Sequence, residues 1–312
     1  METTVSRVLS DSPLPANQNS LKDQVTIVVP TLNEAECIGK LVDEISAAGY
    51  NEILVVDGYS KDDTSRIAEE HGAKVVNQHG KGKAGALLTA FRLVVTPYIV
   101  VMDGDGSYDP KDIDKFLPLM DEFVFVKGDR TRNENMTALH KIGNLMITKT
   151  FNLLFGTSIA DICSGMYLLN TQDIRKLNFE KHPLTVEQEL AAEMVLTSKK
   201  ITSVPINYRK RFGGKSKTNT WRQGFRDLTT NFDLARTYNP ILLFSFLSGL
   251  AIFPSVGLAI YALILYFLFH DYHSGYFIGS AILLVLGAQG LAVATIAAML
   301  RRIERKLNSF SH

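Results

Sequence analysis

The first two thirds of the chain alternate short apolar runs with amphipathic segments. Runs rich in β-branched residues predict buried strands at residues 25–30, 52–57, 74–76 and 98–102. Apolar side chains at helical spacing predict helices at residues 36–48, 62–71 and 80–91. Because strand and helix alternate with short connections, we expect an α/β fold with a mostly parallel sheet and helices on both faces.

Polar side chains follow several of these predicted strands directly. In parallel sheets, ligands bind beyond the carboxyl ends of the strands, where successive strand ends meet. We therefore expect one crevice to be lined by Asn33, Glu34, Asp57, residues 80–83, Asp103 and Asp105. Any one of these could instead be an ordinary turn or helix start, but their coincidence at four strand ends favours a binding site.

The acidic turn after the fourth predicted strand reads Asp103-Gly-Asp105-Gly-Ser107. Two carboxylates at a strand end can hold a divalent ion, and hard oxygen ligands suit Mg²⁺ or Mn²⁺. Since Mg²⁺ usually shares its shell with substrate phosphates, the expected ligand is a diphosphate. The alternative is a solvated turn, because Asp and Gly are common turn residues.

The last third of the chain has a different pattern. Residues 241–269 and 275–300 carry no charged side chain, and each exceeds the approximately 20 residues needed to span a bilayer. Two membrane-spanning helices are therefore expected, the first of them kinked at Pro254. The loop between them lacks Lys and Arg, whereas Arg236 and the basic residues of 301–312 flank the outer ends. This charge distribution predicts that the first two thirds of the chain and both termini are cytoplasmic.

Two further segments complete the predicted organisation. Residues 1–23 are polar and read as a flexible tail. Residues 219–238 place apolar and aromatic side chains at helical spacing between arginines, which indicates a helix in the membrane interface or, alternatively, a surface helix packed on the catalytic domain. Residues 301–312 read as a basic cytoplasmic tail.

Composition narrows the class further. A length of 312 residues suits one to two domains, and the net charge of +1 conceals seven Lys or Arg and no acid between residues 208 and 226. Cys37 and Cys163 lie far apart, so no disulfide framework is implied and a reducing compartment fits. The glycine-rich run at residues 80–85 is not a Walker phosphate loop. No Gly-x-Gly follows the first strand, which argues against a dinucleotide dehydrogenase.

Three ordered motifs carry a resemblance. Val28 to Glu34 (Val-Val-Pro-Thr-Leu-Asn-Glu), Val55 to Ser60 (Val-Val-Asp-Gly-Tyr-Ser) and Val101 to Ser107 resemble the opening motifs of family 2 glycosyltransferases with the A-type nucleotide-binding fold. Residues 24 to about 250 resemble the polyprenyl-phosphate branch, which includes dolichyl-phosphate mannose synthases. They are most similar to the archaeal dolichyl-phosphate hexose transferases of N-glycan assembly. The catalytic domain would then span residues 24–218.

The resemblance implies roles for particular residues. Contacts with the nucleotide sugar would come from Pro30, Leu32, Glu34, Val56, Asp57, Lys81, Asp103, Gly104, Asp105, Ser107, Glu189, Arg211 and Lys217. The metal would lie among Asp103, Asp105 and Ser107, and the acceptor phosphate among Arg130, His140 and Ser164. The residues expected to be catalytic are Asp105, Arg130, Arg211 and Lys217. An alternative for the basic segment around Arg211 and Lys217 is a patch that attracts anionic lipid.

The implied activity is that of a membrane-bound inverting enzyme. It would move one hexose, which could be glucose, N-acetylglucosamine or mannose, from a nucleotide diphosphate sugar to dolichyl or polyprenyl phosphate, with Mg²⁺ or Mn²⁺ and without nucleic acid. Departures from the mannose synthase pattern at Gly58, Ser107, His140, Thr185 and residues 166–167 leave the donor open between UDP and GDP sugars. The oligomeric state is also open.

Alternatives from other classes remain at this point. They are transfer to a different lipid or polysaccharide acceptor and a catalytically inactive membrane scaffold. A sugar-nucleotide pyrophosphorylase would show a glycine-rich loop at its first strand, and a processive polysaccharide synthase would carry Gln-x-x-Arg-Trp. Both motifs are absent from this sequence.

Overall fold

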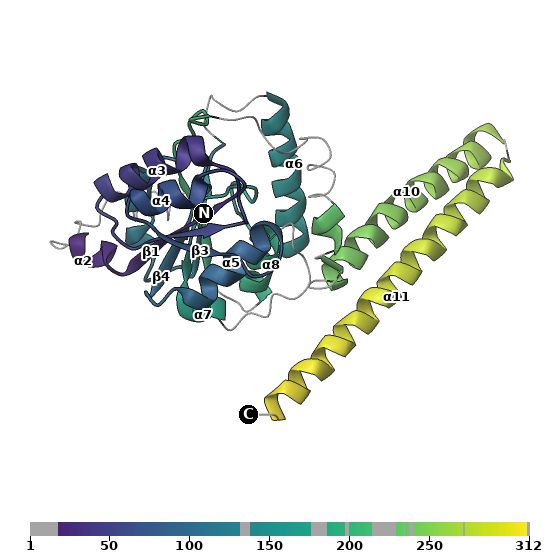
Figure 1. Cartoon of the computed structure of the whole chain (residues 1–312). Coiled ribbons are helices and arrows are strands. Elements are labelled where there is room, and N and C mark those ends of the chain that lie inside the picture. Colours follow the sequence, from purple (N-terminus) through teal and green to yellow (C-terminus); the bar gives the residue numbers. More distant parts are fainter. Residues whose placement is uncertain are drawn as a thin grey trace. The chain divides into compact units, whose positions relative to one another are not determined.

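The computed structural model describes residues 18–131, 138–175, 186–196, 200–213, 229–233, 235–236, 240–270 and 272–310. The chain divides into two compact units, Met1–Thr230 and Asn231–His312. The first unit holds the sheet and the candidate site, and the second holds the two long apolar helices (Figure 1). Each unit is described by itself.

A seven-stranded sheet forms the centre of the first unit. Its strand order is β3-β2-β1-β4-β6-β5-β7, and β6 runs antiparallel to both of its neighbours while every other pairing is parallel. The strands are β1 (Val25–Thr31), β2 (Ile53–Asp57), β3 (Lys74–Asn77), β4 (Tyr98–Val101), β5 (Phe125–Asp129), β6 (Tyr167–Asn170) and β7 (Ile201–Pro205). The prediction of a mostly parallel sheet is confirmed, and the first four strands lie within one residue of the predicted bounds at most ends.

Helices cover both faces of this sheet. Figure 1 shows α3 and α4 on one side of the strands and α5 on the other. The helices and 3₁₀ turns of this unit are α2 (Gln18–Lys22), α3 (Ala35–Ala47), α4 (Thr64–Glu70), α5 (Gly82–Leu93), η1 (Pro110–Lys115), η2 (Leu117–Leu119), α6 (Ala138–Phe155), α7 (Thr171–Arg175) and α8 (Val186–Leu196). The amphipathic helices at 36–48, 62–71 and 80–91 are therefore confirmed as α3, α4 and α5.

The main core lies between the sheet and α3. Ile27 and Val29 of β1 pack in one cluster with Ile38, Leu41 and Ile45 of α3, and all five are fully buried. Burying each such side chain contributes about 1.5 to 3 kcal/mol, so this seam fixes α3 firmly onto β1. As a result, the turn between β1 and α3, which carries Glu34, is held at the carboxyl edge of the sheet.

The second unit consists of α10 (Pro240–Phe269) and α11 (Ser274–Phe310), which lie side by side (Figure 1). Both helices are long and apolar enough to cross a membrane, with mean hydropathies of 2.2 and 2.1 over their most apolar parts. Ser255 and Ser280 donate hydroxyl hydrogen bonds to each other's backbone carbonyls, at 2.8 and 3.0 Å. Gly287 lies against Ile252 without room for a Cβ, so small residues bring the two helices close together.

Three predictions concern the last part of the chain: the basic tail, the interfacial helix and the kink at Pro254. Residues 301–310, predicted as a basic tail, are a helical continuation of α11. The predicted interfacial helix at 219–238 lies largely outside the described residues, although 229–233 and 235–236 are helical. Helix α10 continues through Pro254.

Candidate active site

The parallel strands bring the predicted polar residues to one edge of the sheet. Glu34 follows β1, Asp57 ends β2, and Asp103 and Asp105 follow β4, and these three strands are direct neighbours. Parallel strands point their carboxyl ends the same way, so the acidic groups gather because the sheet is parallel. The coincidence of strand ends that the sequence indicated is therefore a feature of the structure.

The acidic turn after β4 is shaped by glycines. The Oδ1 atom of Asp105 accepts a hydrogen bond of 3.0 Å from the backbone N–H of Ser107. Gly106 has a φ of 72°, and a Cβ there would collide with the ring of Phe212, so glycine is required for both conformation and space. Gly104 is buried, and its Cβ would meet Thr31.

Lys83 connects the first of the two aspartates to α8. Its Nζ lies 2.7 Å from Oδ1 of Asp103 and 2.6 Å from Oε1 of Glu187. The side chains of Lys83 and Glu187 are 34% and 17% exposed, so the pair is accessible to a ligand. Burial alone would lower the pKa of Lys83, but Asp103 and Glu187 raise it well above its ordinary value.

Lys83 belongs to the predicted run of residues 80–83, and Glu187 lies two residues before the predicted sugar contact Glu189. Lys81 is exposed at the N-terminal end of α5, whereas Lys83, two residues later, reaches Asp103. Glu189 is 2% exposed, whereas Glu187 contacts Lys83. The sequence indicates the two short runs that hold Lys83 and Glu187, and tertiary packing decides which side chain of each run lies near Asp103.

The segment from residue 208 to residue 213 lies across the acidic turn. The N–H of Arg209 donates to the carbonyl of Ser107 at 2.7 Å, and the N–H of Phe212 donates to that of Asp105 at 3.3 Å. Lys40 places its ammonium 4.0 Å from the ring centroid of Phe212. The predicted loop is thus anchored at its start, while Lys217 lies outside the described residues.

Arg211 comes from this anchored segment and joins two of the strand ends. Its Nη2 donates to Oε1 of Glu34 at 3.1 Å, and its Nε lies 3.5 Å from Oδ2 of Asp105. The structure therefore brings together three residues predicted for the donor site: Glu34, Asp105 and Arg211. Around the turn two cations, Lys83 and Arg211, face four carboxylates, so negative charge is left over that a divalent cation could neutralise.

The donors around the turn fit a divalent ion that is shared with a diphosphate. Among the described residues no group of three His, Cys, Asp or Glu side chains could hold a metal alone. Asp103, Asp105 and Ser107 offer hard oxygens, and the buried Oγ of Ser107 has no hydrogen-bond partner within the described part of the chain. Since Mg²⁺ is commonly held by one or two carboxylates plus substrate phosphates, these residues suit Mg²⁺ or Mn²⁺ only together with a diphosphate.

The predicted nucleotide residues near β1 and β2 divide into exposed and buried ones. Leu32 is 46% exposed and Pro30 is partly exposed, so both are available to a ligand. Val56 is completely buried within the sheet, so no atom of it is available to a nucleotide in this structure. Asp57 is buried and accepts hydrogen bonds from the N–H and hydroxyl of Ser60, which gives it a structural role in its turn.

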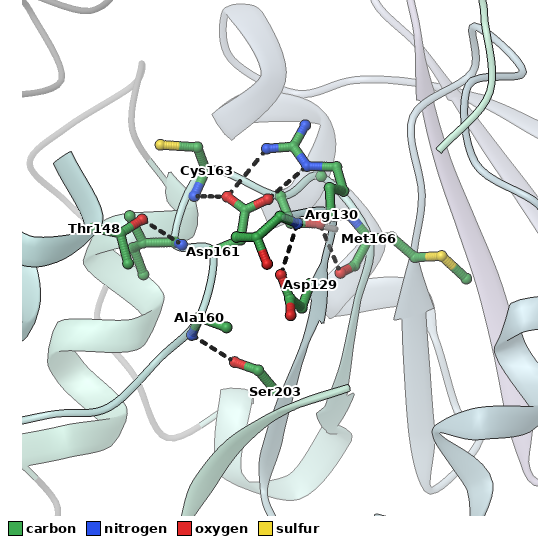
Figure 2. A network of polar contacts seen from close by, with 12 residues as sticks. Asp129, Arg130, Thr148, Ala160, Asp161, Cys163, Met166 and Ser203 are labelled. Carbon is green, nitrogen blue, oxygen red and sulfur yellow. Dashed lines mark hydrogen bonds and ion pairs between the residues drawn. The ribbon is translucent and has the colours of Figure 1, made fainter. Parts of the chain in front are cut away.

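Arg130, predicted to bind the acceptor phosphate, is buried in an ion pair (Figure 2). Its Nε and Nη2 donate to the two carboxylate oxygens of Asp161 at 2.7 and 3.2 Å, and its Nη1 donates to the Tyr108 hydroxyl at 3.2 Å. That hydroxyl in turn accepts from the N–H of Gly165 at 2.7 Å. Burial alone would lower the pKa of Arg130, but Tyr108 and Asp161 raise it well above its ordinary value.

The other two residues predicted for the acceptor lie in different settings. His140 is exposed near the start of α6. Ser164 is fully buried, and its hydroxyl is engaged with the backbone of Met166 at 3.4 to 3.5 Å. Ser164 is therefore part of the buried turn that follows Asp161, and its backbone N–H donates to the carbonyl of Asp161 at 3.4 Å.

The Lys83–Glu187 pair predicts a pH dependence of stability. Burial alone would raise the pKa of Glu187, but Lys83 and Lys127 lower it from 4.5 to about 2. A depressed carboxyl pKa adds stability above about pH 4.5 that is lost as the pH falls toward 2, which amounts to about 2 kcal/mol between pH 6 and pH 3. Chemical denaturation of the full chain in detergent should show this loss in the wild type and a smaller one in Glu187→Gln. Parallel pH profiles for the two proteins would contradict it.

Comparison with known proteins places the chain in a family. Residues 26–177 match the model of glycosyl transferase family 2. The chain is 33% identical over 245 residues to glycosyltransferase AglJ of Haloferax volcanii, a match covering 77% of this chain and 81% of that protein. It is also 30% identical to the dolichyl-phosphate hexose transferase of the same organism over 196 residues, covering 61% of this chain and 85% of that one.

A solved structure shows the same fold. The complex of glucosyl-3-phosphoglycerate synthase from Mycobacterium tuberculosis with Mn²⁺, uridine diphosphate and phosphoglyceric acid superposes with a TM-score of 0.58 at 18% identity. The match covers 72% of this chain and 84% of that one. The fold and its acidic strand end thus define a glycosyltransferase of the A type. The chain belongs to glycosyl transferase family 2, and the predicted family, fold and enzyme class are confirmed.

Proposed function

We propose that the protein transfers one hexose from a nucleotide diphosphate sugar to dolichyl or polyprenyl phosphate at a membrane surface. The observation that supports it most is the set of charges at the end of β4, where Asp103 pairs with Lys83 and Asp105 pairs with Arg211. The same chain has two helices long enough to cross a bilayer. A relative named as a dolichyl-phosphate hexose transferase supports the same acceptor class. The sugar could be glucose, N-acetylglucosamine or mannose.

The arrangement of the strands gives the donor a direction. Glu34 and Leu32 beside β1 would contact the nucleoside, and Asp103 and Asp105 after β4 would hold the diphosphate. When bound, Mg²⁺ or Mn²⁺ would neutralise diphosphate charge at the two aspartates and Ser107. Since β6 and β5 follow β4 in the sheet, the hexose would extend toward those strands and toward Arg130 at the end of β5.

The chain's own residues then position the nucleotide diphosphate sugar and the lipid phosphate, and they neutralise the negative charge of the phosphate groups. A phosphate monoester has a second pKa of about 6, so the acceptor is a dianion near neutral pH and needs no general base. Its oxygen attacks the anomeric carbon as the bond from that carbon to the diphosphate breaks. The configuration inverts and the nucleoside diphosphate leaves with the bonding electron pair. Arg211, freed from Glu34 by the incoming donor, would stabilise the charge of the departing diphosphate.

The apolar hairpin explains how the acceptor is reached. A polyprenyl chain keeps its phosphate at the headgroup level, and a tethered enzyme meets it there. The positive flanks at Arg236 and residues 301–306, with no Lys or Arg between the two spans, favour a cytoplasmic catalytic unit with both termini on that side.

Removing the hairpin should separate donor binding from lipid transfer. A chain cut after Arg236 should still bind nucleotide sugar, because every proposed donor contact lies at or before Lys217. Transfer to long-chain dolichyl phosphate in vesicles should fall on the order of a hundredfold, because the tether no longer concentrates enzyme at the membrane. A short, water-soluble polyprenyl phosphate is the control and should be used equally by both forms. Undiminished transfer in vesicles would show that the hairpin is dispensable.

The donor and acceptor are tested together by one assay. Membranes that contain the full chain are incubated with labelled UDP-glucose, UDP-N-acetylglucosamine or GDP-mannose, with and without added dolichyl phosphate. The proposal expects label in a lipid fraction from one donor, dependent on dolichyl phosphate. Label that enters only a polysaccharide or a different lipid would replace this acceptor with the alternative one.

A further inference from the structure

Lys127 is the middle residue of β5, the strand next to the edge strand β7, and its side chain is fully buried. In β5 it stands opposite Tyr167 of β6 on one side and Ser203 of β7 on the other. Directly opposed residues present their side chains on the same face of a sheet. Lys127 and Tyr167 therefore share the face opposite the core to which Val126 and Val204 belong.

Neither polar end of this pair is hydrogen-bonded to a residue in the described part of the chain. Nζ of Lys127 and the hydroxyl of Tyr167 are buried and make no hydrogen bond to any residue that the structure describes. The ammonium lies 4.5 Å from the ring centroid of Tyr167, a contact that compensates only part of the cost of burying a charge. An apolar side chain of the same length would make the sheet more stable, so the ammonium has no structural advantage here.

The charges that act on Lys127 come from three other segments. Burial lowers the pKa of Lys127 to about 8, and this effect is opposed by Glu187 of α8 and then by Asp161 of the loop after α6. Lys83 of α5 lowers the pKa further, and Cys163 raises it. Asp161 is already held by Arg130, so Glu187 is the carboxylate on which the Lys127 charge acts most strongly.

Glu187 and Lys83 lie where the proposed donor would place its sugar. In the proposed donor position the nucleoside lies beside β1 and the diphosphate lies after β4. The sugar then extends toward β6 and β5, the strands that carry Tyr167 and Lys127. A partly exposed ammonium 2.6 Å from a partly exposed carboxylate offers one donor and one acceptor, which suits hydroxyl groups because each hydroxyl both donates and accepts.

The balance of charge selects among sugars. Lys83 and Lys127 match Asp103 and Glu187 in number, so the group is neutral as a whole. A neutral hexose leaves that balance unchanged. The carboxylate of a hexuronate would meet two carboxylates at short range and is disfavoured by like-charge repulsion.

We propose that Lys127 is a positioning residue of the donor-sugar site, which together with Lys83 holds Glu187 to receive the hydroxyl groups of a neutral hexose. This inference rests on the proposed function for the order of the donor along the sheet edge. Lys127 itself stays below the surface and acts through Glu187. Removing its charge should therefore leave nucleotide binding intact and reduce only the affinity that the sugar adds.

Lys127→Met tests this role, because methionine has a similar length and no charge. Calorimetry on the full chain in detergent with Mn²⁺ compares UDP-glucose with UDP, and GDP-mannose with GDP. The variant should bind the free nucleotide as tightly as the wild type does. The ratio of its affinity for the nucleotide sugar to its affinity for the free nucleotide should be about tenfold smaller than in the wild type. Its thermal unfolding midpoint should rise by about 2 °C or more, because a buried unpaired charge has been removed. Tyr167→Phe is the matched control and should keep the sugar affinity.

Each other outcome overturns the inference. An unchanged sugar affinity in Lys127→Met would make Lys127 a buried cation without a role in sugar binding. A lower unfolding midpoint together with weaker binding of free nucleotide would show a structural role. In the wild type, a larger gain for UDP-glucuronate than for UDP-glucose, or no gain for either neutral sugar, would contradict a site for a neutral hexose. The binding assay contains no lipid acceptor, so it stands even if transfer to dolichyl phosphate fails.

Discussion

Asp105→Asn should reduce hexose transfer by about a hundredfold or more while leaving the protein folded. The asparagine side chain keeps an oxygen that can accept the hydrogen bond from the N–H of Ser107, so the turn after β4 should retain its shape. The negative charge that faces Arg211, and that would help hold a divalent ion with the diphosphate, is lost. The measurement is initial transfer rate in vesicles, with circular dichroism to confirm folding.

Asp109→Asn is the matched control for this variant. Asp109 caps η1 by accepting a hydrogen bond of 3.1 Å from the N–H of Lys111, which an asparagine oxygen can also accept. The control should therefore keep nearly full transfer. Full activity in Asp105→Asn would remove Asp105 from the account, and wild-type activity in excess EDTA would remove the metal.

Arg130→Ala should destabilise the catalytic unit by about 3 to 5 kcal/mol. The reason is that Asp161, which is 2% exposed, would be left buried without its bidentate partner. Loss of transfer in this variant alone would therefore say little about the acceptor, since misfolding would produce the same loss. The pair must be changed together.

The double variant Arg130→Met with Asp161→Asn separates the two roles of Arg130. It removes both charges at once, and the asparagine oxygen can still accept from the N–H of Cys163. Stability should then return to near that of the wild type. If Arg130 also contacts the acceptor phosphate, transfer should remain reduced roughly ten- to hundredfold while nucleotide sugar binds normally. Wild-type transfer in the folded double variant would leave Arg130 with a structural role only.

The sequence was informative where local pattern decides structure. Runs of β-branched residues predicted β1 to β4, and amphipathic spacing predicted α3, α4 and α5. The polar residues after β1, β2 and β4 then had to meet, because parallel strands end at one edge of the sheet. The two uncharged segments likewise predicted α10 and α11 by length and composition alone.

The sequence was less informative where distant segments pair. Asp161 lies 31 residues from Arg130, so the ion pair that buries the predicted acceptor arginine could not be read from spacing. Nor could the sequence show which side chain of residues 80–83 reaches Asp103, because tertiary packing decides this contact.

The burial of Lys127 within the sheet also could not be predicted from the sequence. The single antiparallel strand β6 places Tyr167 beside Lys127, and strand order is a long-range property. An isolated Lys in the strand Phe125–Asp129 would ordinarily mark an exposed or edge position, yet here it is completely buried.

The central claim is that a hexose, and not a hexose phosphate, moves to a lipid phosphate. The most direct test is to identify both products made by the purified full chain from dolichyl phosphate and whichever labelled nucleotide sugar supports transfer. Direct attack of the lipid phosphate on the anomeric carbon predicts a nucleoside diphosphate and a lipid monophosphate hexose of inverted configuration, formed in equal amounts. A nucleoside monophosphate released with a lipid diphosphate hexose would contradict the account, because the broken bond would then lie within the diphosphate.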